Sequence, residues 1–364
     1  MHQRIIDAID DWSPNGDAPG WTDRRFETLA ADLFARQYHR VSEYRNLCDR
    51  RGVNPEDDPE SSEIPAVPTD AFKHVRLFSD DAEATRTFRT SGTTGDNRGA
   101  HHFATLDVYR ASLHPTFQHF CNPDGAPLRI LVLAPPPTDL PDSSLSFMLG
   151  ELVEHHGDDD SDFFVTADDD GTWDLDANAL AQAFDHTCDD GAAALVFGTA
   201  FGFAEFFDRL HRSWSLPPES RLVETGGFKG RFDELSRSAL YDAFTQRLGM
   251  GRNRCLSEYS MTELSSQTYT DHLVAGGQTT GRLYGPPWLD ISIVDPVTLT
   301  PVDTPGQPGL IRFFDLANVD SISAIQTSDR GILHPDGGLE LLGRAPDAQL
   351  RGCSLVIEEI VNKR

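Results

Sequence analysis

The stretch Thr90-Ser91-Gly92-Thr93-Thr94-Gly95, followed by Arg98 and Gly99, carries the strongest indication of fold and chemistry in this 364-residue sequence. Its two glycines let a backbone approach an anion closely, and its hydroxyl groups are short hydrogen-bond donors. It is not a Walker A loop, because the Gly-Lys-Ser/Thr ending is missing, and it lacks the Gly-x-Gly-x-x-Gly dinucleotide fingerprint. The stretch predicts a phosphate-binding loop of another kind, although an ordinary turn of small polar residues would look similar.

A second glycine turn, Gly226-Gly227-Phe228-Lys229, follows the apolar stretch that ends at Thr225. Ligands of α/β proteins bind at the carboxyl ends of strands, so we expect Gly226 and Gly227 near a phosphate. Lys229 is one of only three lysines, with Lys73 and Lys363, in a chain that otherwise uses arginine. A compact ammonium kept at this turn predicts contact with a phosphate or a substrate carboxylate.

The charge of the chain limits its partners. Asp and Glu number 58 against 31 Lys and Arg, which gives a formal net charge of −27. Such a surface repels nucleic acid and anionic membranes, so we expect neither as a partner. It fits a protein that works in high salt, where screening reduces self-repulsion, or simply a solvated acidic face.

The sequence indicates a reduced, cytoplasmic protein. The five cysteines are scattered, with no Cys-x-x-Cys pair, which predicts free thiols without a disulfide framework or zinc site. No apolar run approaches the roughly 18 residues that a membrane-spanning helix requires, and the polar N-terminus does not read as a signal peptide.

Hydrophobic periodicity predicts an α/β fold in which helices alternate with short buried strands. Residues 5–51 favour two or three helices, and the prolines of residues 64–73 favour an extended segment. The elements expected after the loop are helices at residues 107–121, 143–156, 199–210 and 233–248, and strands at residues 128–134, 193–198, 223–225, 289–294, 310–314 and 332–342. Within 199–210, four phenylalanines at helical spacing predict a core helix.

Three further motifs carry polar groups suited to a nucleotide. Tyr259-Ser260-Met261-Thr262-Glu263 offers a carboxylate, which a hard cation such as Mg²⁺ prefers. Thr327-Ser328-Asp329-Arg330-Gly331 offers a second carboxylate, whose two oxygens can accept from the two hydroxyls of a vicinal diol. Gly343-Arg344-Ala345-Pro346-Asp347 adds a cation. Taken singly, the first motif could be a helix cap and the second a hairpin turn.

These motifs, in this order after the Thr/Gly loop, resemble those of the adenylate-forming enzymes. The flanking residues, among them Pro65-Ala66-Val67-Pro68 before Phe72-Lys73 and the Gly-Gly-Phe-Lys-Gly-Arg turn, are similar to the acyl-protein synthetase (LuxE-type) branch, related to phenylacetate-CoA ligases. In Tyr259–Glu263 the usual glycine is replaced by Ser260. The resemblance covers about residues 25–360.

The resemblance implies the large domain of an adenylate-forming enzyme, with parallel-rich sheets flanked by helices, a small β-rich subdomain and a truncated C-terminal stub. We expect residues 1–280 to form the adenylating core, residues 281–343 the β-rich subdomain, and residues 344–364 a hinge and short C-terminal segment. The resemblance also implies ATP and Mg²⁺ as cofactors. In this family, Tyr259 would stack near adenine, Thr262 would contact phosphate, Glu263 would hold the metal, and Asp329 the ribose.

The implied reaction is activation of a carboxylic acid, a long-chain fatty acid in this branch, as its acyl-adenylate. Members of the branch pass the acyl group to a cysteine of their own and then to a partner reductase, and Cys353 matches that cysteine by position. Arg351 would favour its thiolate if the thiol were partly exposed. The usual lysine-bearing C-terminal domain is missing, so Lys229, Lys73 or Arg344 would supply the cation.

Two other functions stay open at this point. An acyl- or aryl-CoA ligase would use the same motifs and transfer to CoA instead of Cys353. A non-catalytic nucleotide- or acyl-binding partner of a reductase complex would bind ATP without turnover. The acid, the acceptor thiol and the oligomeric state are not specified by the sequence.

Overall fold

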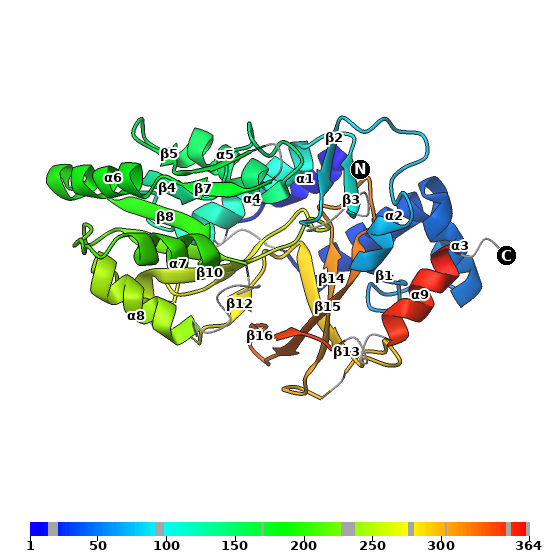
Figure 1. Ribbon diagram of the computed structural model, residues 1–364. Coiled ribbons are helices and arrows are strands. Elements are labelled where there is room, and N and C mark those ends of the chain that lie inside the picture. The colour runs from blue at the N-terminus through cyan, green and yellow to red at the C-terminus, as the bar shows by residue number, and fades with distance from the viewer. Residues whose placement is uncertain are drawn as a thin grey trace. The chain divides into compact units, whose positions relative to one another are not determined.

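The computed structural model describes residues 1–13, 21–91, 98–168, 171–226, 237–275, 280–302, 304–346 and 351–361. The chain divides into two compact units. Unit 1 comprises Met1–Thr116, Ser260–Thr268 and Tyr284–Arg364, and unit 2 comprises Phe117–Tyr259 and Tyr269–Leu283. Figure 1 shows the elements of both.

The helices are α1 (His2–Asp10), α2 (Asp23–Arg40), α3 (Ser42–Arg51), α4 (Asp107–Cys121), α5 (Ser144–His156), α6 (Ala177–Asp190), α7 (Ala200–Arg209), α8 (Arg237–Leu248) and α9 (Arg351–Val361). The strands are β1 (Val67–Pro68), β2 (Arg86–Arg89), β3 (Ala100–Phe103), β4 (Arg129–Leu133), β5 (Asp162–Phe163), β6 (Val165–Ala167), β7 (Trp173–Leu175), β8 (Ala194–Thr199), β9 (Arg221–Thr225), β10 (Cys255–Tyr259), β11 (Thr268–Thr270), β12 (Leu283–Tyr284), β13 (Leu289–Val294), β14 (Gly309–Asp315), β15 (Ala324–Leu333) and β16 (Leu339–Arg344).

Unit 1 is built on an antiparallel meander of β13, β14, β15 and β16. The short strand β1 joins it by parallel pairing, with Val67 opposite Ile325 and Pro68 opposite Gln326. Helix α2 covers β14 through an edge-to-face contact between the rings of Phe26 and Phe314, whose centroids are 5.9 Å apart. Every residue of β14 is buried. A strand enclosed on both faces in this way anchors the segments that carry the polar motifs.

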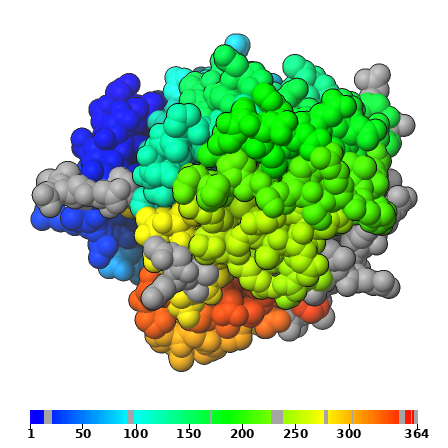
Figure 2. All heavy atoms as spheres, turned by 90° about the vertical axis from the view of Figure 1, so that its left-hand side faces the viewer, coloured from blue at the N-terminus to red at the C-terminus, as the bar shows by residue number. Residues whose placement is uncertain are grey.

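Unit 2 is built on five parallel strands in the order β5, β4, β8, β9 and β10. The residues of β4 and β9 are buried throughout, which is the pattern of a parallel sheet covered on both faces. Helices α6, α7 and α8 pack on it around a core of aromatic side chains. Their green to yellow-green atoms form a continuous layer in Figure 2.

The structure confirms most of the predicted elements and corrects two. Residues 332–342 are not one strand, because Asp336-Gly337, with a glycine φ of +80°, turns β15 back into β16. The Thr327–Gly331 motif is not a turn, because it lies inside β15, where a register shift after Arg330 marks an irregularity. The phenylalanines of α7 are mainly core residues: Phe203 and Phe206 are both 1% exposed.

Candidate active site

Glu263 is a buried carboxylate in unit 1. It is 6% exposed, and burial raises its pKa to about 7. The positive charges of Lys73 and Arg344 lower that pKa, whereas the negative charge of Asp329 raises it. The charges of Lys73 and of the β15–β16 hairpin thus act on the same carboxylate.

The backbone around Glu263 is fixed by two buried polar side chains. Asn318 Nδ2 donates to the Glu263 carbonyl at 2.8 Å. The Asp315 carboxylate accepts from the amides of Ser265 and Ser266, each at 2.9 Å, and is itself fully buried. Since an unpaired buried carboxylate is costly, these bonds hold the segment in one conformation.

Asp329 and Arg344 face each other across β15 and β16. They are directly paired in the strand register, and Arg344 Nε lies 3.9 Å from Asp329 Oδ1. The Asp329 amide donates to Thr327 Oγ1 at 3.1 Å, and that hydroxyl donates to the Ile311 carbonyl at 2.8 Å. The predicted ribose carboxylate and the predicted hinge arginine therefore occupy one end of the β15–β16 hairpin.

Thr262 is tied to β3 by a histidine that the sequence reasoning did not select. His101 Nδ1 lies 2.8 Å from the Thr262 carbonyl oxygen, which can only accept, so this nitrogen carries the hydrogen. The ring is 1% exposed, and burial lowers its pKa to about 4. It also contacts the ring of Phe72 at a centroid distance of 5.8 Å. In the sequence, only the adjacent pair His101-His102 draws attention to this residue, and the pair does not indicate that His101 donates to the Thr262 carbonyl.

The predicted phosphate loop is the connection of the β2–β3 hairpin. Thr90 donates from its amide to the Gly99 carbonyl at 3.0 Å, and the Gly99 amide donates to Thr90 Oγ1 at 2.9 Å. Arg98 Nε donates to the Thr90 carbonyl at 2.7 Å. A Cβ on Gly99 would lie 3.0 Å from Thr90 Cγ2, which explains the glycine. Ser91 follows the last paired residue, and Gly92, Thr93, Thr94 and Gly95 lie outside the described residues.

Gly226 and Tyr259 belong to unit 2. Gly226 directly follows strand β9, and Tyr259 is the last residue of the parallel strand β10. At these strand ends Thr225 pairs with Glu258, and the Thr225 hydroxyl donates to the Glu258 carboxylate. Gly226 has a φ of +75°, as the predicted glycine turn requires. Gly227 and Lys229 lie outside the described residues, so their predicted roles remain predictions.

Cys353 is enclosed in unit 1. It lies on α9, is 7% exposed, and packs in a cluster with Val294, Leu310 and Ala345. Burial raises its pKa to about 11. The side chain of Arg351 lies outside the described part of the chain. In this conformation the thiol is protonated and packed among apolar side chains. It is therefore not a nucleophile, because nucleophilic attack requires the thiolate.

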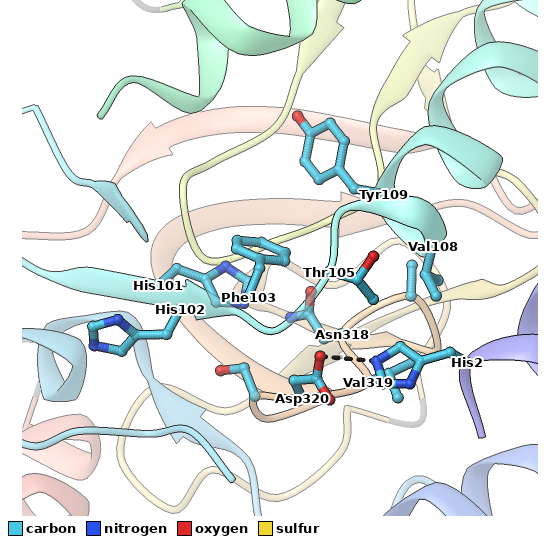
Figure 3. Close-up of a pocket in the computed structure, with 12 residues that line it drawn as sticks. His2, His101, His102, Phe103, Thr105, Val108, Tyr109, Asn318, Val319 and Asp320 are labelled. Carbon is cyan, nitrogen blue, oxygen red and sulfur yellow. Dashed lines mark hydrogen bonds and ion pairs between the residues drawn. The ribbon is translucent and has the colours of Figure 1, made fainter. Parts of the chain in front are cut away.

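A narrow pocket of unit 1 is lined by His101, Phe103, Tyr109 and Asp320, among others (Figure 3). The Asp320 carboxylate is already engaged: one oxygen lies 2.8 Å from His2 Nε2, and the other accepts from Arg36 Nη2 at 3.2 Å. The pocket is therefore best explained as part of the packing of the N-terminal helices.

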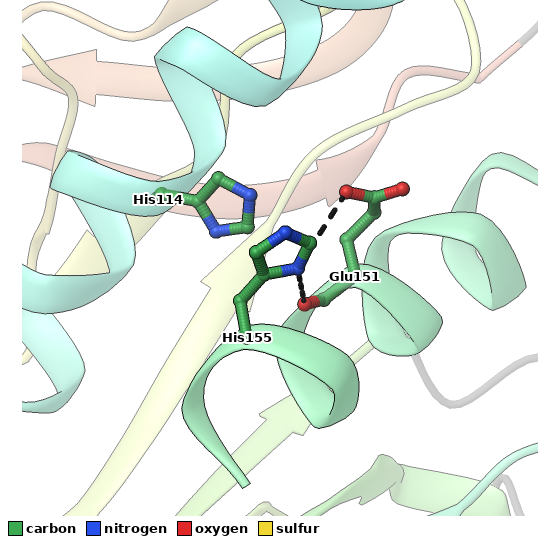
Figure 4. A group of neighbouring side chains, drawn as sticks. All are labelled: His114, Glu151 and His155. Atoms are coloured by element: carbon green, nitrogen blue, oxygen red, sulfur yellow. Dashed lines mark hydrogen bonds and ion pairs between the residues drawn. The ribbon is translucent and has the colours of Figure 1, made fainter.

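Unit 2 contains two sets of neighbouring histidine and carboxylate side chains. On α5, His155 Nδ1 lies 2.9 Å from the Glu151 carbonyl oxygen and 3.9 Å from its carboxylate, one helical turn away (Figure 4). Asp160 and Asp190 lie near His186, but Arg129 Nη2 is 2.8 Å from both carboxylates. Because the guanidinium already supplies the cation there, this second group is explained as an ion-pair network.

Solved structures place the fold among the adenylate-forming ligases. The chain superposes on a 2-hydroxyisobutyryl-CoA ligase, in its open conformation with 2-HIB-AMP and CoA, with a TM-score of 0.63 over 93% of this chain and 81% of that one, at 14% identity. It matches an ATP-bound MatB from Rhodopseudomonas palustris with a TM-score of 0.51, at 14% identity, over 72% of this chain and 48% of that one.

Sequence comparison is more specific. The family model for the acyl-protein synthetase LuxE matches residues 20–362, so the chain belongs to this family. A long-chain-fatty-acid–luciferin-component ligase of Vibrio harveyi is 22% identical over 96% of this chain and 93% of its own length. The corresponding ligase of Aliivibrio fischeri is 21% identical over 93% and 89%. The chain is thus an acid–thiol ligase by family.

None of the helices in its described ranges is long and apolar enough to cross a membrane.

Proposed function

We propose that this protein activates a long-chain fatty acid with ATP and transfers the acyl group to a thiol, first to its own Cys353 and then to a partner acyl reductase. The observation that carries the proposal is the convergence of charge on Glu263: the predicted metal carboxylate, the predicted ribose carboxylate Asp329 and the cation Arg344 act on one another within unit 1. The similar ligases of Vibrio harveyi and Aliivibrio fischeri support the choice of acid.

The residues present fit a magnesium ion. Glu263 is a carboxylate whose burial makes the anion unfavourable by itself, as its pKa of about 7 indicates, and a bound dication would compensate that cost. We assign Glu263 as its protein ligand. Bound Mg²⁺ would offset phosphate charge in this site.

The other side chains bind and orient the nucleotide. Asp329 would accept hydrogen bonds from the ribose hydroxyls, and Arg344, paired with it, would turn toward phosphate. Thr90 and Ser91 would lead the loop amides and hydroxyls toward the same phosphates. The family resemblance assigns contacts with the nucleotide or the acid to a further set of residues, and we propose the same contacts for them here. They are Gly92, Thr93, Thr94, Gly95, Gly226, Gly227, Lys229, Tyr259 and Thr262. A substrate carboxylate held in line with the α-phosphate would then react through proximity.

Transfer to Cys353 requires the thiol to leave its apolar cluster. A group that is 7% exposed with a pKa of about 11 is neither accessible nor ionised near neutral pH. We therefore propose that α9 moves away from this cluster during the cycle. The second candidate function, an acyl- or aryl-CoA ligase, is favoured by the same burial, since CoA would need no movement of α9.

The test is the fate of a labelled fatty acid incubated with ATP and Mg²⁺. The proposal predicts a hydroxylamine-sensitive acyl mass on the peptide containing Cys353, which is lost in Cys353→Ser while adenylate formation continues. The control is Cys188→Ser, because Cys188 is exposed and its thiol donates to the Ser215 carbonyl of unit 2 at 3.4 Å. Acyl-CoA formation by Cys353→Ser at the wild-type rate would instead establish the CoA ligase. ATP binding without turnover of any acid would leave a non-catalytic partner.

A further inference from the structure

Lys73 is the only lysine in the described part of the chain, since Lys229 and Lys363 fall outside it. It ends a short 3-10 turn, Thr69–Lys73, that begins directly after β1. Strand β1 runs parallel to the first half of β15, so the turn lies further along in the direction of Asp329. The topology of unit 1 alone carries this lysine toward the end of the sheet where the site is built.

The residue before it fixes its backbone. Phe72 is 3% exposed, and its ring contacts His101, whose Nδ1 in turn donates to the Thr262 carbonyl. A chain of packed groups therefore links the turn of Lys73 to the residue that precedes Glu263. The base of the phosphate loop shares this anchor, because a Cβ on Gly99 would lie 3.4 Å from Phe72 Cβ.

The ammonium group itself is not locked. The Lys73 side chain is 37% exposed, and its Nζ lies 2.5 Å from Asp70 Oδ1, three residues earlier. Asp70 is 50% exposed and also approaches His74 Nε2 at 3.5 Å. An exposed local pair of this kind is weak and exchanges readily. At the same time the charge of Lys73 acts on the buried Glu263 carboxylate.

We propose that Lys73 is a catalytic residue that leaves Asp70 to bind the triphosphate of ATP beside Glu263 and stabilises the charge that departs with pyrophosphate. This inference rests on the proposed function. In the step concerned, a carboxylate oxygen of the acid forms a bond to the α-phosphorus while the bond from that phosphorus to the oxygen bridging to the β-phosphate breaks. The bonding electrons leave with pyrophosphate, and no proton is transferred.

The Lys73 ammonium suits this task better than the Arg344 guanidinium. Lysine supplies a point charge with three donors that can follow a leaving phosphate, whereas a guanidinium is planar and suited to fixed two-point contacts. Arg344 already faces Asp329 and is 67% exposed. Lys73 therefore supplies the positive charge that follows the departing pyrophosphate.

The experiment compares Lys73→Gln, Lys73→Arg and Asp70→Asn with the wild type. The matched control is Arg40→Gln, which also removes one positive charge of unit 1 from an exposed ion pair, with Asp81. Acid-dependent exchange of pyrophosphate into ATP and the affinities for ATP and adenosine are measured, with thermal unfolding as the check on folding. We expect Lys73→Gln to slow exchange by about 30-fold or more and to weaken ATP about tenfold, with adenosine affinity unchanged.

Asp70→Asn and Arg40→Gln are expected to keep near-wild-type exchange, and Lys73→Arg to recover only part of the loss. Unchanged exchange and ATP affinity in Lys73→Gln would overturn the inference while leaving the proposed function intact. An equal loss in Asp70→Asn would overturn it too, because the pair would then be structural. If the wild type binds ATP but exchanges with no acid, the proposed function fails, and the ATP and adenosine affinities alone still decide the role of Lys73.

Discussion

Asp329 and Arg344 lie opposite each other on β15 and β16, 3.9 Å apart at their nearest charged atoms. The carboxylate belongs to one motif and the guanidinium to another, and the hairpin turn between them brings both to one end of the sheet. Asp329 is 28% exposed and Arg344 67%, so both can reach a ligand from the solvent side. The Asp329 backbone is held by the hydrogen bond from its amide to Thr327 Oγ1 at 3.1 Å.

The first prediction concerns the ribose. If Asp329 accepts from both hydroxyls, removal of the 2′-hydroxyl from ATP will weaken wild-type binding by about tenfold or more, since a hydrogen bond to a charged group contributes about 1.5–3 kcal/mol. In Asp329→Asn, ATP and 2′-deoxy-ATP should bind almost equally. The measurement is a calorimetric double-mutant cycle, with Asp336→Asn in the β15–β16 turn as the control. If loss of the 2′-hydroxyl weakened binding to Asp329→Asn as much as binding to the wild type, Asp329 would not be the residue that binds the ribose.

The second prediction uses the two buried groups with opposite shifts of pKa. Glu263 has its pKa raised from 4.5 to about 7, so its contribution to the free energy of unfolding is complete below about pH 4.5 and is lost as the pH rises through 7. His101 has its pKa lowered from 6.5 to about 4, so its contribution is complete above 6.5 and is lost as the pH falls through 4. Each contribution to the free energy of unfolding amounts to about 3 kcal/mol, and the two change in opposite directions with pH.

Single variants should separate the two contributions. Relative to the wild type, Glu263→Gln should lose stability as the pH falls from 7 to 4.5, because the opposing contribution of His101 remains. His101→Asn, which can still donate to the Thr262 carbonyl, should gain stability over the same range. Urea unfolding at several pH values without nucleotide or Mg²⁺ measures both. Variant curves parallel to the wild-type curve would show that neither group is perturbed.

The third prediction concerns thiol reactivity. Cys188 is exposed, whereas Cys353 is buried with a pKa of about 11, which leaves about a thousandth of it as thiolate at pH 8. Iodoacetamide should therefore modify Cys188 first and Cys353 only slowly in the free protein. Peptide mass spectrometry over time gives the two rates. Equal rates would mean that α9 does not protect its cysteine, and the need for movement before acyl transfer would disappear.

The fourth prediction separates core from pocket on α7. Phe203 is 1% exposed and packs against Phe244 with ring centroids 4.9 Å apart, so Phe203→Ala should cost about 3–5 kcal/mol of unfolding free energy. Phe201 is 37% exposed, so Phe201→Ala should lower the free energy of unfolding much less. Chemical unfolding measures the cost. A shift of acid chain-length preference in Phe203→Ala, at unchanged stability, would instead place this ring in the acyl pocket.

Local patterns predicted the elements well because they depend on neighbouring residues. The strand at residues 289–294 and the helices near residues 107–121 and 143–156 were found by periodicity, which reports burial along one segment. The pairing of Asp329 with Arg344 was not predicted, because the order of motifs along the chain does not give the register of two strands. The hairpin turn at Asp336-Gly337 was missed because the prediction extends one strand over residues 332–342, although Pro335-Asp336-Gly337 inside that range is itself a turn signal.

The remainder depends on contacts between distant segments. His101 and Thr262 are 161 residues apart, and no pattern in one indicates the other. Cys353 is buried because α9 lies on α3 and β1, aided by the ion pair of Arg51 with Glu359. The sequence placed a cysteine near the C-terminus but not its packing against Val294 and Leu310. Burial and pKa follow from tertiary packing and could not be inferred from spacing.

The most direct test of the central claim is acid-dependent exchange of labelled pyrophosphate into ATP, measured at low and high salt with fatty acids of graded length and a few aryl acids. The account predicts exchange with long-chain fatty acids, a reduction of about 100-fold or more in Glu263→Gln, and no reduction in the exposed control Glu83→Gln. Exchange that is undiminished in Glu263→Gln, or absent with every acid although ATP binds, would contradict it.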